Sequence, residues 1–397
     1  MIISIIIVFV VLAYTLLVLL LPLPALKSSF NSTTLHIKIP PANLSWPSYG
    51  EAAVGLIDSG VLQTNGNQKP LPTASVAKLI TALSVLNKYP LSTGEQGPFI
   101  TIDATDYNYY TTYVSEQGSV VPVYAGEQLS EYQMLEAMLI PSGNNIADSL
   151  ARWAFGSISN YTAYANNYVK HMGMNNTYVS GDASGFLPST TSTANDLIIL
   201  GAKVMANPVL KQIVGLKSVD IPNVGVMKNY DNILGSDGFI GIKTGNNNQD
   251  PGVFLGALSV NIKGVSETLL TAVMGAPSLE TALTSTLPLA ISLQSNFKDT
   301  ILINKGDVLG SYTQPWGGTI QAVSKSDFSL FAFPGQTISL KLKLNPLKMP
   351  VKVGVVVGNV SLQTNQFNTA SMGSVVTESV TTNPSIAWRF THPLSIL

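Results

Sequence analysis

The 397-residue sequence contains no cysteine, only three histidines and only two arginines, and 11% of its residues are charged. The absence of cysteine excludes disulfides, thiolate metal ligands, a cysteine nucleophile and an acylated lipoprotein cysteine. Three dispersed histidines argue against a transition-metal site. A net charge of −1 argues against a nucleic-acid-binding protein, which needs a basic surface. We therefore expect no metal, no cofactor and no nucleic-acid partner.

Charge is missing altogether from residues 1–26, of which 22 are hydrophobic. The apolar run from Met1 to Leu21 is long enough to cross a bilayer core of about 30 Å. A cleaved signal peptide begins with basic residues and has a shorter apolar stretch, so we predict an uncleaved, single-pass transmembrane anchor over residues 1–26. A signal peptide that ends near Ala25 is the alternative. Lys27 and Lys38 follow the run, and by the positive-inside rule they favour a cytoplasmic position for the rest of the chain. Because two lysines are a weak bias, the orientation has to be inferred from the function.

The remaining sequence predicts two domains, as expected for a chain of this length. Residues 27–45, rich in Ser, Asn and Pro, are predicted to form a linker before a mixed domain over 46–298. A small all-β domain is predicted over 299–397, with no helix beyond Asp299, because residues 339–345 alternate with period two. In the mixed domain the apolar spacing predicts strands at 52–58, 238–245, 252–260 and 268–276, and helices at 73–87 (capped by Thr73), within 130–155, at 194–206 and at 278–297.

Serine chemistry without histidine is the catalytic arrangement that the composition permits. A Ser-His-Asp triad would need His171, which lies in a polar segment without a nucleophile elbow and is better interpreted as a surface or packing residue. Ser75 and Lys78 lie one turn apart at the start of a predicted helix, where a lysine of lowered pKa can act as the base and free N–H groups suit an oxyanion. The spacing alone is weak evidence, because Ser295 and Lys298 share it and have no evident role.

Two further polar motifs follow in the chain. Ser142-Gly143-Asn144 interrupts an apolar stretch, which indicates that these small polar residues face a cleft, although the same spacing occurs twice elsewhere. Lys243-Thr244-Gly245 occurs once, at the end of a predicted strand. It can place a cation, a hydroxyl and edge N–H groups along a substrate; alternatively it is a strand that ends in an ordinary exposed lysine.

Together the motifs S-x-x-K, S-x-N and K-T-G are typical of penicillin-binding proteins and serine β-lactamases. With the segments around them, they make residues 50–297 resemble the D-alanyl-D-alanine carboxypeptidases, the low-molecular-mass penicillin-binding proteins of peptidase family S11. The resemblance implies an α/β (α+β) catalytic domain of the serine β-lactamase/transpeptidase type, followed by a small β domain. It also implies removal of the terminal D-Ala from peptidoglycan pentapeptides through a serine acyl-enzyme, inhibition by β-lactams, and a catalytic domain on the outer side of the cell membrane.

The resemblance also assigns roles to the motif residues. Ser75 is expected to be the acylated nucleophile and Lys78 its general base. Ser142 and Asn144 are expected to relay the proton and to bind the substrate amide.

The third motif is expected to bind the other end of the substrate. Lys243 and Thr244 would hold the terminal carboxylate, and the backbone N–H groups of Ser75 and Asn246 would form the oxyanion hole. Members of the family often carry His-Thr or Tyr-Thr directly after K-T-G, whereas this chain has Asn246 and Asn247. With two arginines in the chain, an arginine that grips the terminal carboxylate is expected to be missing.

Three alternative functions are considered beside the carboxypeptidase. A DD-endopeptidase that cuts peptidoglycan cross-links would use the same site, and the sequence does not separate the two. A class A β-lactamase needs a glutamate for deacylation, and no glutamate occurs between Ser142 and Lys243. A non-catalytic wall-binding protein would not need the complete set of motif residues. At the C-terminus Pro393 argues against an amphipathic membrane helix, and Trp388 and Phe390 would then pack in the β domain.

Overall fold

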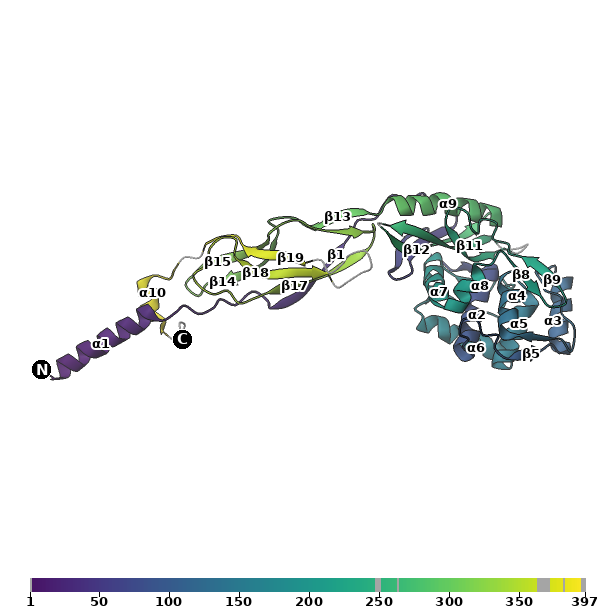
Figure 1. The fold of residues 1–397 in the computed structure, drawn as a ribbon, viewed down its shortest axis with the longest axis horizontal. Coiled ribbons are helices and arrows are strands. Elements are labelled where there is room, and N and C mark those ends of the chain that lie inside the picture. Colours follow the sequence, from purple (N-terminus) through teal and green to yellow (C-terminus); the bar gives the residue numbers. More distant parts are fainter. Residues whose placement is uncertain (1, 247–250, 263, 363–371, 381–382, 394–397) are drawn as a thin grey trace. The chain divides into compact units, whose positions relative to one another are not determined.

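The computed structural model describes residues 2–246, 251–262, 264–362, 372–380 and 383–393 (Figure 1). Contacts divide the chain into two compact units. We call residues 41–296 the α/β unit, and residues 1–40 together with 297–397 the β unit. The β unit is therefore built from both ends of the chain, and the α/β unit is inserted between them.

A five-stranded antiparallel sheet forms the centre of the α/β unit, in the order β10-β11-β12-β2-β3. Side chains alternate across it: Leu270 and Ala272 belong to the large core cluster, while Leu269, Thr271 and Val273, which alternate with them along β12, are also buried. Helix α7 contacts β2, β3 and β12, and α9 contacts β11 and β12, so helices cover both faces (Figure 1). The strands are β2 Glu51–Leu56, β3 Gly60–Asn65, β10 Phe239–Gly245, β11 Gly252–Ile262 and β12 Val265–Ala276.

The helices of the α/β unit pack around a core of Leu, Ile, Val and Ala. They are η1 Ala74–Val76, α2 Ala77–Lys88, α3 Ala104–Ser115, α4 Glu131–Leu139, α5 Asn144–Phe155, α6 Ile158–His171, α7 Ala194–Ala206, α8 Pro208–Val214 and α9 Leu279–Ser295. Short strand pairs connect them: β4 Leu71–Pro72 with β7 Thr191–Ser192, β5 Phe99–Thr101 with β6 Gln128–Ser130, and β8 Ser218–Ile221 with β9 Gly225–Lys228.

The predicted helices at 194–206 and 278–297 are confirmed, but the predicted cap of the first helix is wrong. Thr73 makes no side-chain cap bond; its hydroxyl donates to the carbonyl of Thr190 at 3.3 Å instead. Ala74 has a φ of +43°, and a single 3₁₀ turn precedes α2. Thr73 is thus the N-cap residue of this turn by position, but its hydroxyl does not cap it, and the left-handed Ala74 lies between Thr73 and Ser75.

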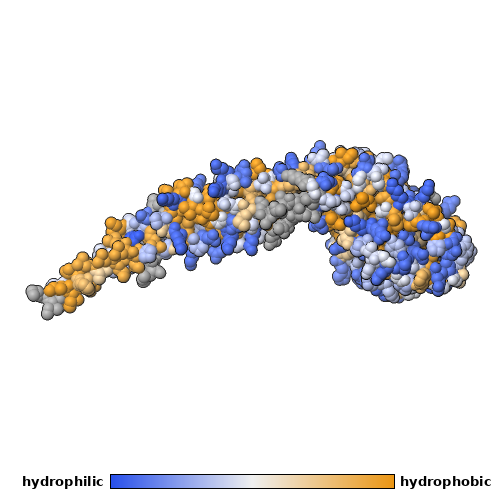
Figure 2. Space-filling model, in the orientation of Figure 1, coloured by the Kyte–Doolittle hydropathy of each residue, from blue (hydrophilic) through white to orange (hydrophobic). Residues whose placement is uncertain are grey.

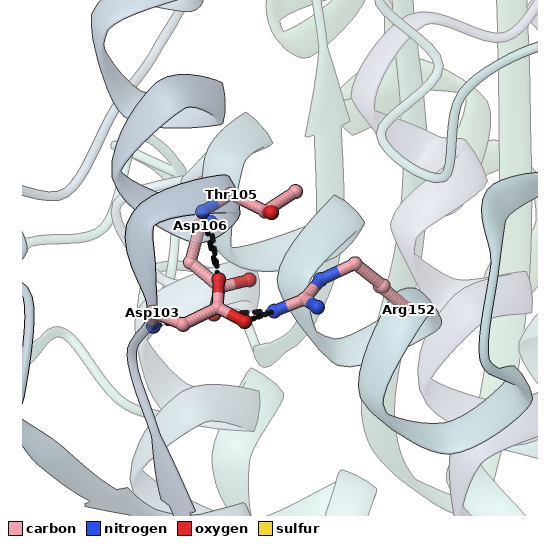
Figure 3. A network of polar contacts seen from close by, with 4 residues as sticks. All are labelled: Asp103, Thr105, Asp106 and Arg152. Carbon is pink, nitrogen blue, oxygen red and sulfur yellow. Dashed lines mark hydrogen bonds and ion pairs between the residues drawn. The ribbon is translucent and has the colours of Figure 1, made fainter.

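A network of charged side chains joins the start of α3 to the end of α5 (Figure 3). Asp103 accepts hydrogen bonds from the backbone of Thr105 and Asp106, and Asp106 reciprocates in a capping box. Arg152, in the last turn of α5, binds both carboxylates at 2.9 and 2.8 Å. These bonds hold α3 against α5, and α3 leads directly into the segment Glu116–Ser119 that lines the pocket described below.

The β unit contains a six-stranded antiparallel sheet in the order β1-β17-β18-β19-β15-β14 and a separate pair, β13 with β16. Its strands have one buried and one exposed face. In β17, for example, exposed and buried residues alternate, and the buried ones form the core of the β unit. The strands are β1 Ser32–Lys38, β13 Lys298–Ile303, β14 Val308–Thr313, β15 Thr319–Ser324, β16 Phe328–Ala332, β17 Thr337–Leu344, β18 Val356–Leu362 and β19 Met372–Thr377.

The predicted linker over residues 27–45 is wrong for its first half. Residues Ser32–Lys38 form β1, which pairs with β17 along seven residues, and Leu26 is buried and bridged to Leu347. Leu35 and Ile37 alternate with exposed neighbours and pack against the core of the β unit, but this short alternation lies in a segment rich in Ser and Asn and is a weak local signal. Pairing with β17, and not local propensity, makes this segment a strand.

The β unit also contains two helices, one early and one late in the sequence. Helix α1, Ile2–Leu20, is apolar and almost wholly exposed, and its length and hydropathy suit a membrane span. The expectation of no helix beyond Asp299 is wrong, because Ile386–Thr391 forms the short helix α10 with Ser385 as its N-cap. Six residues are too few for a period to be visible, and the contacts of α10 with α1 stabilise it instead.

Candidate active site

Ser75 lies in η1, directly after the left-handed Ala74, on a pocket of about 430 Å³. The pocket wall facing this turn requires glycine at position 185. A Cβ on Gly185 would lie 2.1 Å from the carbonyl oxygen of Ala74, and its φ of +72° also favours glycine. Close approach of these two backbone segments therefore holds the turn that presents Ser75.

Lys78 lies one turn after Ser75, on α2, and is completely buried. Its Nζ lies 2.8 Å from Ser75 Oγ and 2.6 Å from Asn144 Oδ1, and it donates to the carbonyl of Ser184 at 3.1 Å. The predicted pair is thus in direct contact, and a third residue from the second motif joins it.

The surroundings of Lys78 hold its pKa well below the usual value for lysine. Burial has the largest effect, and the positive charge of Lys243 adds to it, while Asp182 and Asp148 act in the opposite direction. A neutral amine in contact with the Ser75 hydroxyl can accept its proton, so the arrangement suits general-base activation of a serine.

Ser142 and Asn144 lie at the break between α4 and α5 and line the same pocket. Ser142 has a φ of +63°, and its buried Oγ has no hydrogen-bond partner among the described residues. Asn144 directs its Oδ1 to Lys78, which leaves its Nδ2 to donate elsewhere. A Cβ on Gly118 would lie 2.7 Å from this Nδ2, so the glycine leaves room for the amide.

The third motif lies on β10, the edge strand of the sheet, next to η1. Gly245 approaches the first motif so closely that a Cβ there would lie 2.8 Å from the carbonyl oxygen of Thr73. Thr244 and Asn246 line the pocket, whereas their neighbour Lys243 is buried and is not part of its lining. Burial lowers the pKa of Lys243 to about 8. Asn247, the next residue of the sequence prediction, lies outside the described residues.

Sequence reasoning missed a buried aspartate on α5 that organises the pocket. Asp148 accepts from the hydroxyl of Tyr113 at 2.7 Å and from the backbone N–H of Ala183 at 2.8 Å. Burial raises the pKa of its carboxyl to about 7. Asp148 thereby connects α3 to the segment that contains Ser184, whose carbonyl binds Lys78.

A second missed aspartate holds the same segment from within. Asp182 accepts from the backbone N–H groups of Ser184, Phe186 and Leu187. Phe186 and Leu187 line the pocket. The cluster of small and polar residues GDASG predicts a loop, but the sequence around it does not show that the backbone of this loop contacts Lys78.

A third missed aspartate, Asp231, faces Lys243. Its Oδ2 and the Nζ of Lys243 are both buried without a hydrogen-bond partner among the described residues, and each charge favours the ionised form of the other. Burial raises the pKa of Asp231 to about 6. The adjacent Tyr230 lines the pocket.

The described residues include no group of three histidine, aspartate or glutamate side chains placed to hold a metal ion. The pocket therefore combines a serine, a lysine of lowered pKa, an unpartnered hydroxyl, an amide and a second buried lysine. These groups suit acyl transfer to the serine from a substrate that carries a negative charge.

Comparisons with known proteins agree with this chemistry. The peptidase S11 family, described as D-alanyl-D-alanine carboxypeptidase, matches residues 53–278. The D-alanyl-D-alanine carboxypeptidase DacB2 of Mycobacterium tuberculosis is 29% identical over 208 residues, which make up 51% of this chain and 67% of that protein. A solved D-alanyl-D-alanine carboxypeptidase from the same organism has a TM-score of 0.53 and 27% identity, over 64% of this chain and 97% of that one.

Two longer structures extend the likeness in fold beyond the α/β unit. Penicillin-binding protein 5 of Haemophilus influenzae has a TM-score of 0.58 at 18% identity and covers 86% of this chain and 99% of its own. The carboxypeptidase DacD of Francisella tularensis has a TM-score of 0.59 at 18% identity and covers 87% and 97%. The predicted fold class is confirmed. Because the S11 family spans more than half of the chain, this protein belongs to the serine-type D-alanyl-D-alanine carboxypeptidases of peptidase family S11.

Proposed function

We propose that the protein removes the terminal D-Ala from peptidoglycan stem peptides through an acyl-enzyme on Ser75. The observation that carries this proposal is the contact between Ser75 Oγ and the buried Nζ of Lys78, whose pKa is held well below its usual value. Lys78 takes the proton of Ser75 as the serine oxygen attacks the carbonyl carbon of the penultimate D-Ala. The backbone N–H groups of Ser75 and Asn246 stabilise the resulting oxyanion.

Collapse of the tetrahedral intermediate breaks the peptide C–N bond and forms the serine ester. The proton passes from Lys78 to the departing amine of D-Ala, with the unpartnered hydroxyl of Ser142 as the relay between them. Asn144, fixed by its bond to Lys78, donates its Nδ2 to the amide carbonyl of the stem peptide. Water then attacks the ester, the ester C–O bond breaks, and Ser75 regains its proton. A β-lactam acylates Ser75 in the same way, but its ring C–N bond breaks and the leaving nitrogen stays attached to the acyl group, so we expect inhibition.

Lys243 and Thr244 recognise the terminal carboxylate. Thr244 lines the pocket and donates its hydroxyl, while the buried Lys243 next to it supplies positive charge. The outer edge of β10 carries no strand partner among the described residues, so its backbone groups are available to an extended peptide.

Labelling with a fluorescent penicillin tests the proposal. The wild-type protein should become covalently labelled, and Ser75→Ala should reduce labelling by at least about 10³-fold. Ser295→Ala is the matched control, because Ser295 has the same spacing to a lysine but is exposed at the end of α9. Equal loss in both variants, or labelling that survives Ser75→Ala, would show that Ser75 is not the nucleophile.

Release of D-Ala from a pentapeptide, beside cleavage of a cross-linked peptide dimer, tests the reaction itself. We expect D-Ala release from the pentapeptide. Activity confined to the dimer would instead identify a DD-endopeptidase.

We also propose that α1 is a single-pass membrane anchor and that both units lie on the outer side, where peptidoglycan is found. Deletion of residues 1–21 should release the protein from membranes and leave penicillin labelling intact, because Leu26 and β1, which belong to the β unit, are retained. Continued membrane association of a folded, labelled deletion variant would contradict the anchor.

A further inference from the structure

Arg389 of α10 binds the C-terminal end of α1. Its Nη1 donates to the carbonyl oxygens of Val18, Leu19 and Leu21 at 3.1, 3.2 and 3.2 Å. The last carbonyls of a helix lack intrahelical partners and carry the negative end of the helix dipole. A guanidinium at this place satisfies them and is favoured electrostatically. Arg389 therefore acts as the C-terminal cap of a helix more than 360 residues away in the sequence.

A second contact joins the two helices one turn earlier along α1. The hydroxyl of Tyr14 donates to the carbonyl of Phe390 at 2.8 Å, and the two rings lie 5.9 Å apart. Tyr14 and Val18 are four residues apart and so share one face of α1. Val18 is completely buried, whereas Leu17 next to it is 51% exposed. One face of α1 is thus covered by protein at Val18 and contacted by it at Tyr14, which stays 38% exposed, and the rest is open.

The same short helix gathers aromatic side chains at this end of α1. Trp388 packs edge-on against Trp316 of the β unit, with ring centroids 5.5 Å apart, and stacks on His392 at 4.8 Å. Trp and Tyr concentrate where a membrane meets water, because their rings are apolar and their N–H or O–H groups are polar.

We propose that α10 is a membrane-interface collar, which clamps α1 to the β unit and lies in the lipid headgroup layer where α1 leaves the bilayer. The inference rests on the proposed anchor role of α1. Nineteen residues of helix extend about 29 Å, close to the thickness of the hydrocarbon core, so the end bound by Arg389 falls at the lipid–water boundary. Hydrophobic residues cover most of α1 up to this end (Figure 2).

The collar also distinguishes a retained anchor from a cleaved signal peptide. Cleavage near Ala25 would remove all three carbonyl acceptors of Arg389 and the ring against which Phe390 packs. These contacts favour a retained anchor over a cleaved signal peptide. They further imply that the β unit is held at the membrane surface by α10 as well as by the chain that follows α1.

Quenching of tryptophan fluorescence by brominated lipids tests the position of α10. The chain has four tryptophans, so a variant that keeps Trp388 alone is made by Trp46→Phe, Trp153→Phe and Trp316→Phe. The full-length variant is reconstituted in phosphatidylcholine vesicles with bromine placed on the acyl chains near the headgroups. We expect Trp388 to lose most of its fluorescence, whereas a matched variant that keeps Trp153 alone, on α5, loses little.

Flotation and penicillin labelling separate the possible failures. A labelled protein that floats with the vesicles but whose Trp388 is no more quenched than Trp153 would overturn the collar alone. A labelled protein that does not float would overturn the anchor and the collar together. Loss of labelling with normal flotation and quenching would concern the proposed reaction and would leave the collar supported.

Cysteine cross-linking tests the contact between α1 and α10 directly, because the chain has no other cysteine. Tyr14→Cys with Phe390→Cys should be joined by a short bifunctional thiol cross-linker in the membrane-bound protein, because the tyrosine side chain spans the gap between the two backbones; the product is detected as a linked peptide pair after proteolysis. Leu17→Cys with Phe390→Cys is the control, since Leu17 lies on the exposed side of α1. Equal cross-linking of both pairs, or of neither, would show that α10 does not hold a fixed face of α1.

Discussion

The two units of the molecule differ in the number of charged side chains that they bury. In the α/β unit at least eight of the 22 acidic residues of the chain are buried, together with two lysines, Lys78 and Lys243. The acidic ones are Glu51, Asp106, Glu131, Asp148, Asp182, Asp196, Asp231 and Glu267. Among the described residues of the β unit, the buried polar side chains are the uncharged Gln314, Ser324 and Thr377.

The buried charged groups belong to the unit that contains the pocket, whereas the β unit has an apolar core. A buried ionisable group costs free energy unless it is paired, hydrogen-bonded or neutralised by a shifted pKa. The pKa values of Lys78, Lys243, Asp148 and Asp231 are all shifted towards the neutral form, and all four lie in or next to the pocket. Burial of so many charged side chains in a chain with only 11% charged residues also leaves its surface poorer still in charge.

The largest expected effect comes from the buried lysine that contacts Ser75. Lys78→Met should slow acylation by penicillin by about 10²–10⁴-fold, because the serine loses its general base. Lys341→Met is the control, since Lys341 lies on the exposed face of β17 and should label at the wild-type rate. The measurement is the rate of covalent labelling under single-turnover conditions. A wild-type rate for Lys78→Met would mean that another group deprotonates Ser75.

The next effect concerns the buried aspartate that holds the Ser184 segment. Asp148→Ala leaves the Tyr113 hydroxyl and the Ala183 N–H without their acceptor, which should cost about 2–6 kcal/mol of unfolding free energy. Displacement of the Ser184 carbonyl from Lys78 should slow acylation roughly 10- to 100-fold. Asp148→Asn keeps an acceptor for Ala183 and should retain most of both properties. Equal loss in the two variants would show that the negative charge itself is required.

The wild type and Asp148→Asn together test how the stability contributed by Asp148 changes with pH. The pKa of Asp148 is raised to about 7 in the folded state, so its contribution to stability is fully present below about pH 4 and is lost as the pH rises through 7. Urea unfolding of the wild type between pH 4 and 7 should include this loss, and Asp148→Asn should lack it. Identical pH dependence in both proteins would contradict the raised pKa.

A smaller effect is expected at the carboxylate-binding end of the pocket. The pKa of Lys243 is about 8, so the KM for a peptide with a free carboxylate should rise above that pH, while kcat changes less. Asp231→Asn removes the negative charge that favours the ammonium form, and the rise should begin about one pH unit lower. Asp327→Asn, an exposed aspartate of the β unit, should leave the profile unchanged. An unshifted profile in Asp231→Asn would show that Asp231 does not support Lys243.

The motif residues of the pocket could be found from the sequence because each motif is a short spacing on one element and the three motifs together resemble a known family. Ser75 and Lys78 share a helix turn, and Lys243 and Thr244 share a strand. Asp148 and Asp231 could not be found in this way, since their roles arise from contacts between α5, α3 and the Ser184 segment, or between β10 and the loop before it.

In the fold, too, the elements that depend on distant contacts could not be predicted from the sequence. The strands β11 and β12 and the helix α7 were predictable because long apolar runs and a regular helical period specify them locally. Strand β1 and helix α10 were not, because one is defined by pairing with β17 and the other by packing on α1. Both pairings join residues more than 290 positions apart, and no sequence window contains them.

The smallest effect on the active site should come from a large defect in the β unit. Leu342 is a buried residue of β17, and Leu342→Ala should cost about 2–5 kcal/mol of stability through the cavity that it leaves. Because the buried side chains of this core are uncharged among the described residues, the defect changes apolar packing alone, and the rate of penicillin acylation should stay at the wild-type value while the protein is folded. Thermal unfolding of the membrane-bound protein, followed in parallel by labelling, checks both parts. A marked fall in the acylation rate below the unfolding transition would show that the β unit contributes to the chemistry and not only to the placement of the pocket.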